Sequence, residues 1–100
     1  MSDISFTWDD NKNLINQKKH DGINFDEAKT VFYDEFARVI FDPEHSESED
    51  RFIILGISQK LRVLVVCHCY KESDSLIRII SARKATKKEE DAYEQQRNAK

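Results

Sequence analysis

The residues with the clearest chemical potential are three arginines and a histidine in the second half of the chain: Arg62, His68, Arg78 and Arg83. The planar guanidinium of arginine binds two phosphate oxygens at once. Histidine titrates near neutral pH and can therefore take up or release a proton under physiological conditions. This combination suits chemistry on a phosphate group, with the arginines binding the anion and His68 carrying the proton.

The charge of the chain is unevenly distributed along its 100 residues, although the formal net charge is only −3. Residues 60–88 contain 8 Lys and Arg against 2 Asp and Glu, whereas residues 1–59 contain 6 against 13. Screening limits the reach of each charge to about 8–10 Å at physiological salt. An acidic protein can therefore present a local positive field that attracts phosphates. Lys84, Lys87 and Lys88 lie in this basic segment and are candidate phosphate-binding residues.

Other common site chemistries have little support in the sequence. Cys67 and Cys69 are two residues apart in a predicted strand and share a face, while His68 points to the opposite face. A zinc site would lack convergent ligands, so we interpret the cysteines as small buried residues and expect no metal or cofactor. The chain also lacks a glycine-rich phosphate loop, a Ser–His–Asp arrangement and an HExxH helix. Nucleotide hydrolysis and zinc proteolysis are therefore disfavoured.

The first half of the chain predicts one strand and two helices. Residues 4–8 alternate Ile, Phe and Trp with Ser and Thr, the period of a half-buried edge strand. A helix that Asp9 and Asp10 can cap is predicted to run to about residue 20, and a second helix is predicted to begin after the capping Asn24. Gly22 fits a left-handed helix stop between them. His20 lies at the negative end of the first helix dipole, which favours a capping role over a catalytic one.

The second half predicts hairpins followed by a helix. Strands are expected over residues 36–42, 51–58 and 61–70 and from Leu76, and Pro43 ends the first of them. Residues 44–50 are acidic and predict a mobile loop that repels nucleic acid. Thr86 and Glu89 have the spacing of a capping box and begin a last helix. The predicted fold is one two-layer α+β domain over residues 1–100, with two N-terminal helices and a C-terminal helix on a mostly antiparallel sheet.

Side-chain alternation within residues 61–70 predicts which face of the sheet is buried. One set is wholly apolar or weakly polar and is expected to be core: Leu61, Val63, Val65, Cys67 and Cys69. The other set is mixed and is expected to be partly open: Arg62, Leu64, Val66, His68 and Tyr70. Alternation in the last strand places Arg78 and Arg83 on opposite sides, and the hairpin register decides which of them joins Arg62 and His68. The sequence leaves both registers open.

Two blocks of the sequence resemble the BrnT family of bacterial toxins. They are FTWDDNKNLINQKKHDGINFDEAKTVFYD at residues 6–34 and RIISARKATKKE at residues 78–89, the latter followed by Tyr93 and Glu94. The family is similar to RelE-type ribonuclease toxins, which are paired with a DNA-binding antitoxin. The resemblance implies a RelE-like fold, an endoribonuclease activity that inhibits translation and growth, an RNA substrate, and a cognate BrnA-like, DNA-binding antitoxin as partner.

RNA cleavage without a metal requires a group that removes the 2′-hydroxyl proton, a proton donor for the leaving 5′-oxygen and cations near the phosphorane. We assign Arg83, Arg62, Arg78 and His68 to catalysis, and the three lysines to RNA binding. The alternative is a non-catalytic module that binds RNA or protein through the same basic face. No apolar run of membrane-spanning length and no signal-peptide pattern is present, which predicts a cytoplasmic protein without a membrane partner.

Overall fold

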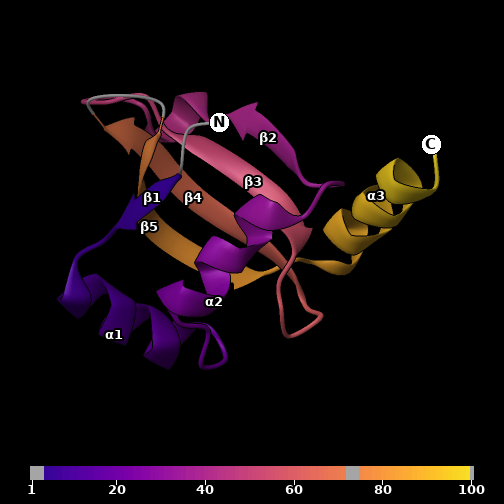
Figure 1. Ribbon diagram of the computed structural model, residues 1–100, viewed down its shortest axis with the longest axis horizontal. Coiled ribbons are helices and arrows are strands. Elements are labelled where there is room, and N and C mark those ends of the chain that lie inside the picture. The colour runs from indigo at the N-terminus through magenta and orange to yellow at the C-terminus, as the bar shows by residue number, and fades with distance from the viewer. Residues whose placement is uncertain (1–3, 72–74, 100) are drawn as a thin grey trace.

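The structure of the protein is a computed structural model that describes residues 4–71 and 75–99 (Figure 1). Its elements follow one another as β1 (Ser5–Thr7), α1 (Asp10–Lys19), α2 (Phe25–Thr30), η1 (Val31–Tyr33), β2 (Arg38–Phe41), η2 (Pro43–His45), β3 (Phe52–Ile57), β4 (Val63–Lys71), β5 (Leu76–Lys84) and α3 (Lys87–Asn98). The labels η1 and η2 denote short 3-10 helices. The predicted order of strands and helices is confirmed.

The five strands form one sheet in the order β1-β5-β4-β3-β2. The pairs β2–β3, β3–β4 and β4–β5 are antiparallel, as the predicted hairpins require, and β1 runs parallel to β5. Figure 1 shows α1 and α2 on one side of the sheet and α3 beyond one end of β3. An α+β arrangement of three helices on a mostly antiparallel sheet is therefore confirmed.

Each α-helix begins at a capping residue identified in the sequence. Asp9 accepts from the backbone N–H of Asn11 at 2.8 Å, and Asn24 accepts from that of Glu27 at 2.7 Å. At the start of α3, the Thr86 hydroxyl and the Glu89 carboxylate form the predicted capping box. Local sequence chemistry thus specifies where these helices start.

Helices α1 and α2 lie over one face of the sheet, which we call the covered face. Its core contains Ile23, Phe25, Ala28, Val31, Ile54, Leu64, Val66, Ile79 and Ala82. Leu64, Val66 and His68 of β4 are fully buried there, whereas Val63, Val65 and Cys67 point to the other side, the open face. The prediction of which β4 set forms the core was wrong. Both sets are largely apolar, so the docking of the helices, which alternation does not encode, decides between them.

A buried asparagine attaches α1 to β5. The Asn16 amide donates to Ala82 O at 2.8 Å and to Ile23 O at 3.0 Å, and its oxygen accepts from Ala82 N at 3.0 Å. The apolar Leu14 and Ile15 are instead exposed. Since β1 pairs only with the first part of β5, the remaining edge of β5 has free backbone groups, and the Asn16 amide pairs with them as a neighbouring strand would.

An irregularity in the β4–β5 ladder decides where two of the predicted arginines lie. The register pairs Cys67 with Ser81 but His68 with Ile79, so one residue of β5 is left over, as in a β-bulge. Arg83 is then opposite Val65, and Arg78 is opposite Cys69. Opposed residues share a face, so both arginines lie on the open face. Their predicted placement on opposite sides was wrong, because strict alternation ends at a bulge.

Candidate functional site

The open face contains a cavity of about 230 Å³ in which histidines and arginines meet. Its lining residues are His20, Asp42, His45, Arg51, Ile53, Val65, Cys67, Ile80, Ser81 and Arg83. The polar ones come from the end of α1, the η2 turn, the residue before β3 and the end of β5. We call this the histidine–arginine cavity, and it is the candidate active site.

His45 and Asp42 form a hydrogen-bonded pair at this cavity. His45 Nδ1 lies 2.8 Å from Asp42 Oδ2. Because an ionised carboxylate only accepts hydrogen bonds, Nδ1 carries the hydrogen and Nε2 is directed elsewhere. The Asp42 side chain is 9% exposed and that of His45 is 63% exposed. The arrangement therefore fixes an accessible imidazole whose Nε2 can exchange a proton with a ligand.

Arg51 supplies a cation with an unused donor. Its Nε is buried and has no hydrogen-bond partner in the part of the chain that the structure describes. Its Nη2 is 3.8 Å from Glu49 Oε2, a long ion-pair contact. A buried unsatisfied donor is costly unless a further acceptor binds to it. Arg51 is therefore suited to hold an anion in the histidine–arginine cavity.

Arg83 is held in a fixed position by α3. Its Nη1 and Nη2 donate to the two carboxylate oxygens of Glu89 at 2.8 and 3.0 Å, and Nη1 also donates to Lys84 O at 3.3 Å. The hydrogen bonds from Arg83, together with those from Thr86, lower the pKa of Glu89 to about 2. These contacts use three of the five guanidinium hydrogens. The Nε–H and one Nη2–H of Arg83 remain available to a phosphate.

His20 ends helix α1, as predicted, and it also lines the histidine–arginine cavity. Its backbone N–H donates to Asn16 O at 2.9 Å and ends α1, as the sequence predicted. Its side chain lines the histidine–arginine cavity. The sequence carries no sign of this second feature, because it depends on how Asn16 docks α1 against the edge of β5.

His45 was missed because residues 44–50 were expected to form a mobile loop. The structure shows a 3-10 turn over Pro43–His45, and the segment is anchored by Ser46 Oγ, which donates to Asp42 O at 2.6 Å. Glu49 accepts from Lys71 Nζ at 3.0 Å, which offsets part of the acidic charge. Residues 46–51 lie outside helices and strands, as a loop prediction requires, and a hydrogen-bonded turn precedes them. The i,i+3 spacing of Asp42 and His45 around a proline was the sequence signal available.

His68, the predicted proton carrier, lies away from the cavity. Its side chain is fully buried on the covered face, with the ring centroid 4.8 Å from that of Phe32. Nδ1 lies 3.1 Å from Val66 O, and burial lowers the pKa of His68. An imidazole enclosed in this way presents no surface to an RNA substrate.

Of the three predicted arginines, only Arg83 lines the histidine–arginine cavity. Arg62 forms a bidentate ion pair with the buried Glu27, which also accepts from Ser58. Burial raises the pKa of Glu27, but the hydrogen bonds from Arg62 and Ser58 outweigh it and the net change is a lowering. Arg78 lines a separate depression with Lys71 and other residues. The structure therefore separates these cations instead of bringing them together.

The three predicted RNA-binding lysines lie on the surface near the start of α3. Lys84, Lys87 and Lys88 are all exposed. Lys87 Nζ is 3.2 Å from Asp91 Oδ1 in an i,i+4 pair. Lys84 and Lys87 line a surface hollow together with Arg62. They are available for contacts with a polyanion or a partner protein.

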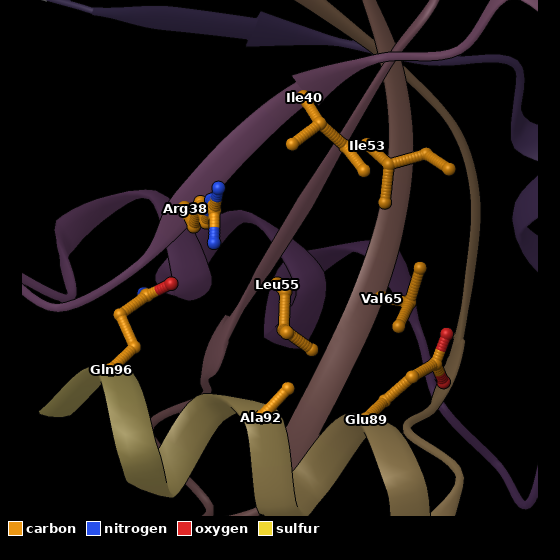
Figure 2. Close-up of a pocket in the computed structure, with 8 residues that line it drawn as sticks. All are labelled: Arg38, Ile40, Ile53, Leu55, Val65, Glu89, Ala92 and Gln96. Carbon is orange, nitrogen blue, oxygen red and sulfur yellow. The ribbon is translucent and has the colours of Figure 1, made fainter.

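A second cavity, of about 390 Å³, lies between α3 and the open face (Figure 2). Arg38, Ile40, Ile53, Leu55, Val65, Glu89, Ala92 and Gln96 line it, and we call it the apolar cavity. It shares Ile53 and Val65 with the histidine–arginine cavity. Tyr93 fixes α3 above it by donating to Asp34 Oδ2 at 2.6 Å.

Metal-binding side chains are scattered. Over residues 4–71 and 75–99, no group of three His, Cys, Asp or Glu is placed to hold a metal ion. Cys67 and Cys69 are free thiols, and burial raises the pKa of both. The same part of the chain contains no helix long and apolar enough to cross a membrane.

The sequence matches a known class of proteins, the ribonuclease toxins of type II toxin–antitoxin systems. The family model described as "Ribonuclease toxin, BrnT, of type II toxin-antitoxin system" matches residues 8–89, a segment that contains every polar residue of the histidine–arginine cavity. The chain belongs to this BrnT family. Membership of a type II system implies an antitoxin partner.

A solved structure confirms the fold. The 1.1 Å crystal structure of the Brucella abortus ribonuclease toxin BrnT superposes with a TM-score of 0.62 at 21% sequence identity. The match covers 84% of this chain and 99% of that one. No curated protein sequence gives a significant match to the chain.

Proposed function

We propose that the protein is a cytoplasmic, RelE-like endoribonuclease that cleaves RNA without a metal at the histidine–arginine cavity, and that it thereby inhibits translation and growth. The observation that carries the proposal is the convergence of His20, His45, Arg51 and Arg83 from four separate elements. A general base, a proton donor and cations that bind phosphate are the groups that such a reaction uses. Family membership supports the ribonuclease class.

The reaction follows from the roles of these groups. His45 Nε2, with Nδ1–H held by Asp42, accepts the proton of the ribose 2′-hydroxyl as the 2′-oxygen attacks phosphorus. His20 donates a proton to the 5′-oxygen as the P–O5′ bond breaks, which leaves a 2′,3′-cyclic phosphate and a 5′-hydroxyl. Arg51 and Arg83 stabilise the charge that develops on the phosphorane oxygens.

The ion pair with Glu89 supports a role for Arg83. It fixes the guanidinium before substrate arrives, and preorganised cations stabilise a transition state without reorganisation during the reaction. A lysine at this position would supply charge without the planar fork. Arg83→Lys should therefore restore only part of the activity that Arg83→Ala loses.

The antitoxin is proposed to be a BrnA-like, DNA-binding protein that covers the basic surface near the start of α3. Lys84, Lys87 and Lys88 are exposed there, and an interface of roughly 1,200–2,000 Å² suffices for stable sequestration. Acetylation of these three lysines should slow when the antitoxin is added. Unchanged labelling of all three would place the interface elsewhere.

Single-turnover cleavage of RNA by purified variants tests the catalytic proposal. Arg83→Ala, His45→Gln and His20→Gln should each slow cleavage by about 10²- to 10³-fold. Arg78→Ala is the matched control, because Arg78 lies on the same face and the same strand but outside the cavity, and it should lose less than about tenfold. Thermal melting shows whether each variant remains folded.

Three outcomes would contradict the proposal. A folded His20→Gln, His45→Gln double variant that cleaves at the parental rate would remove the acid–base scheme. Activity abolished by EDTA and restored by Mg²⁺ or Zn²⁺ would show a metal-dependent reaction. Binding of RNA by the parent without cleavage, together with growth unaffected by induced expression, would favour a non-catalytic binding module.

A further inference from the structure

We propose that the apolar cavity binds the nucleobase next to the scissile phosphate and so determines the sequence preference of cleavage. The inference rests on the proposed function, because it takes the phosphate to lie at Arg83. The apolar cavity adjoins the histidine–arginine cavity, since Ile53 and Val65 line both cavities. A nucleotide that places its phosphate in one cavity can therefore place its base in the other.

The sheet register orders the relevant side chains in one row across four strands. Arg83 of β5 is opposite Val65 of β4, Val65 is opposite Leu55 of β3, and Leu55 is opposite Arg38 of β2. All four lie on the open face. Neighbouring strands are about 4.8 Å apart, so the two arginines are separated by roughly 14 Å of sheet with an apolar floor between them. This order places an apolar floor between two cations on the same face of the sheet.

The apolar cavity has the composition of a base-binding site. Its floor consists of the aliphatic side chains of Ile40, Ile53, Leu55 and Val65. Its volume of about 390 Å³ falls within the usual range for small-molecule pockets. Sequence-specific RNA recognition relies on unstacked bases that lie against flat or apolar groups and form hydrogen bonds along their edges. The Arg38 guanidinium has no hydrogen-bond partner within the described residues and can stack on a base or bind the next phosphate.

The polar groups above the floor favour bases that donate hydrogen bonds. Figure 2 shows Glu89 and Gln96 at the two ends of the α3 segment that borders the cavity, with Ala92 between them. The Glu89 carboxylate only accepts. The Gln96 amide nitrogen already donates to Phe36 O, which leaves its oxygen as the free acceptor. Adenine, guanine and cytosine donate through an exocyclic amino group, whereas uracil has none and donates only through its N3–H, so uracil should be the least favoured base.

A substitution that fills the apolar cavity tests the inference without touching the histidines or Arg83. Ala92 faces the cavity from α3, so Ala92→Leu would occupy the space of the base. Gln95→Leu is the matched control, because Gln95 is exposed on the same helix and is not part of the lining. The substrates are oligoribonucleotides with one cleavable position, flanked by each of the four bases or by an abasic residue.

The parent and Gln95→Leu should cleave the substrate with the best base at least about tenfold faster than the substrate with uracil, a ratio typical of one or two directed contacts. Ala92→Leu should reduce this ratio to within about threefold and cleave the abasic substrate at the parental rate. Equal slowing of every substrate, the abasic one included, would overturn the inference. So would unchanged discrimination by Ala92→Leu.

A binding measurement separates failure of this inference from failure of the proposed function. Methyl NMR signals of Leu55 and Val65 should shift on titration with guanosine 3′-monophosphate but not with ribose 5-phosphate. These shifts would show the base subsite even if no RNA were cleaved. Cleavage without such shifts would refute the subsite alone. Loss of antitoxin binding in Ala92→Leu with nucleotide shifts unchanged would identify the cavity as a protein-docking site and would equally refute the subsite.

Discussion

Glu89→Gln should destabilise the protein at neutral pH, and the effect should disappear in acid. The Glu89 carboxylate accepts from both Arg83 nitrogens and from the backbone N–H of Thr86. Its pKa is about 2, against an ordinary value of 4.5. A pKa lowered by folding means that the ionised carboxylate stabilises the folded state above about pH 4.5 and loses this effect as the pH falls towards 2.

The size of the effect follows from the exposure of the pair. Fully realised, the lowered pKa would correspond to roughly 3 kcal/mol of folding free energy. The Arg83 and Glu89 side chains are 42% and 32% exposed, so solvent screening reduces the expected value to about 1 kcal/mol. A glutamine can still accept from Thr86, which preserves part of the helix cap. The expected loss in Glu89→Gln is therefore about 1 kcal/mol at pH 7.

Urea unfolding of the parent and the variant at pH 7, 4 and 3 measures this difference. The loss should fall to less than half of its neutral-pH size by about pH 3. Glu90→Gln is the control, because Glu90 lies in the same first turn of α3 and its carboxylate forms no ion pair with any residue that the structure describes. The reasoning is refuted if the loss is the same at pH 7 and pH 3, or if Glu90→Gln loses as much as Glu89→Gln.

Two further predictions concern buried polar residues. Asn16→Ala should lower the free energy of unfolding by about 3 kcal/mol in urea, because buried backbone groups of Ala82 and Ile23 lose their partner, whereas the exposed Asn11→Ala should change it little. Equal losses of unfolding free energy in Asn16→Ala and Asn11→Ala would contradict the attachment of α1 to β5 through Asn16. Burial lowers the pKa of His68, so the unfolded chain binds the proton first and stability should fall by up to about 1.4 kcal/mol per pH unit below 6.5. The difference between the melting temperatures at pH 7.5 and pH 5.5 should be smaller in His68→Phe than in the parent. An unchanged difference would show that groups other than His68 cause the pH dependence.

The sequence by itself determined the order of the elements and the starts of the helices. Caps at Asp9, Asn24 and Thr86 act over three residues of chain, so their chemistry is readable without tertiary contacts. The strands followed from runs of apolar residues between polar turns, and their hairpin connections fixed the antiparallel pairing. The two quoted blocks also identified the family, which the family model confirmed.

The sequence also pointed to one member of the candidate site. Arg83 lies near the end of β5, shortly before the capping box of α3, and both elements are specified locally, so its position at a rigid junction followed from the sequence. Its ion pair with Glu89 did not follow, since the capping role was the one favoured for that carboxylate. The capping box explains how one side chain serves both Thr86 and Arg83.

Only the tertiary structure decided which faces and loops the site would use. Alternation reports that two sides of a strand differ but not which side the helices cover, so His68 was placed on the wrong face. The bulge in the β4–β5 ladder places Arg78 and Arg83 on one face, and no local sequence pattern indicates that bulge. His20 and His45 line one cavity because Asn16 docks α1 and Asp42 orders the following turn. Contacts between residues far apart in the chain set these positions, and a pattern read along the chain carries only the interactions of near neighbours.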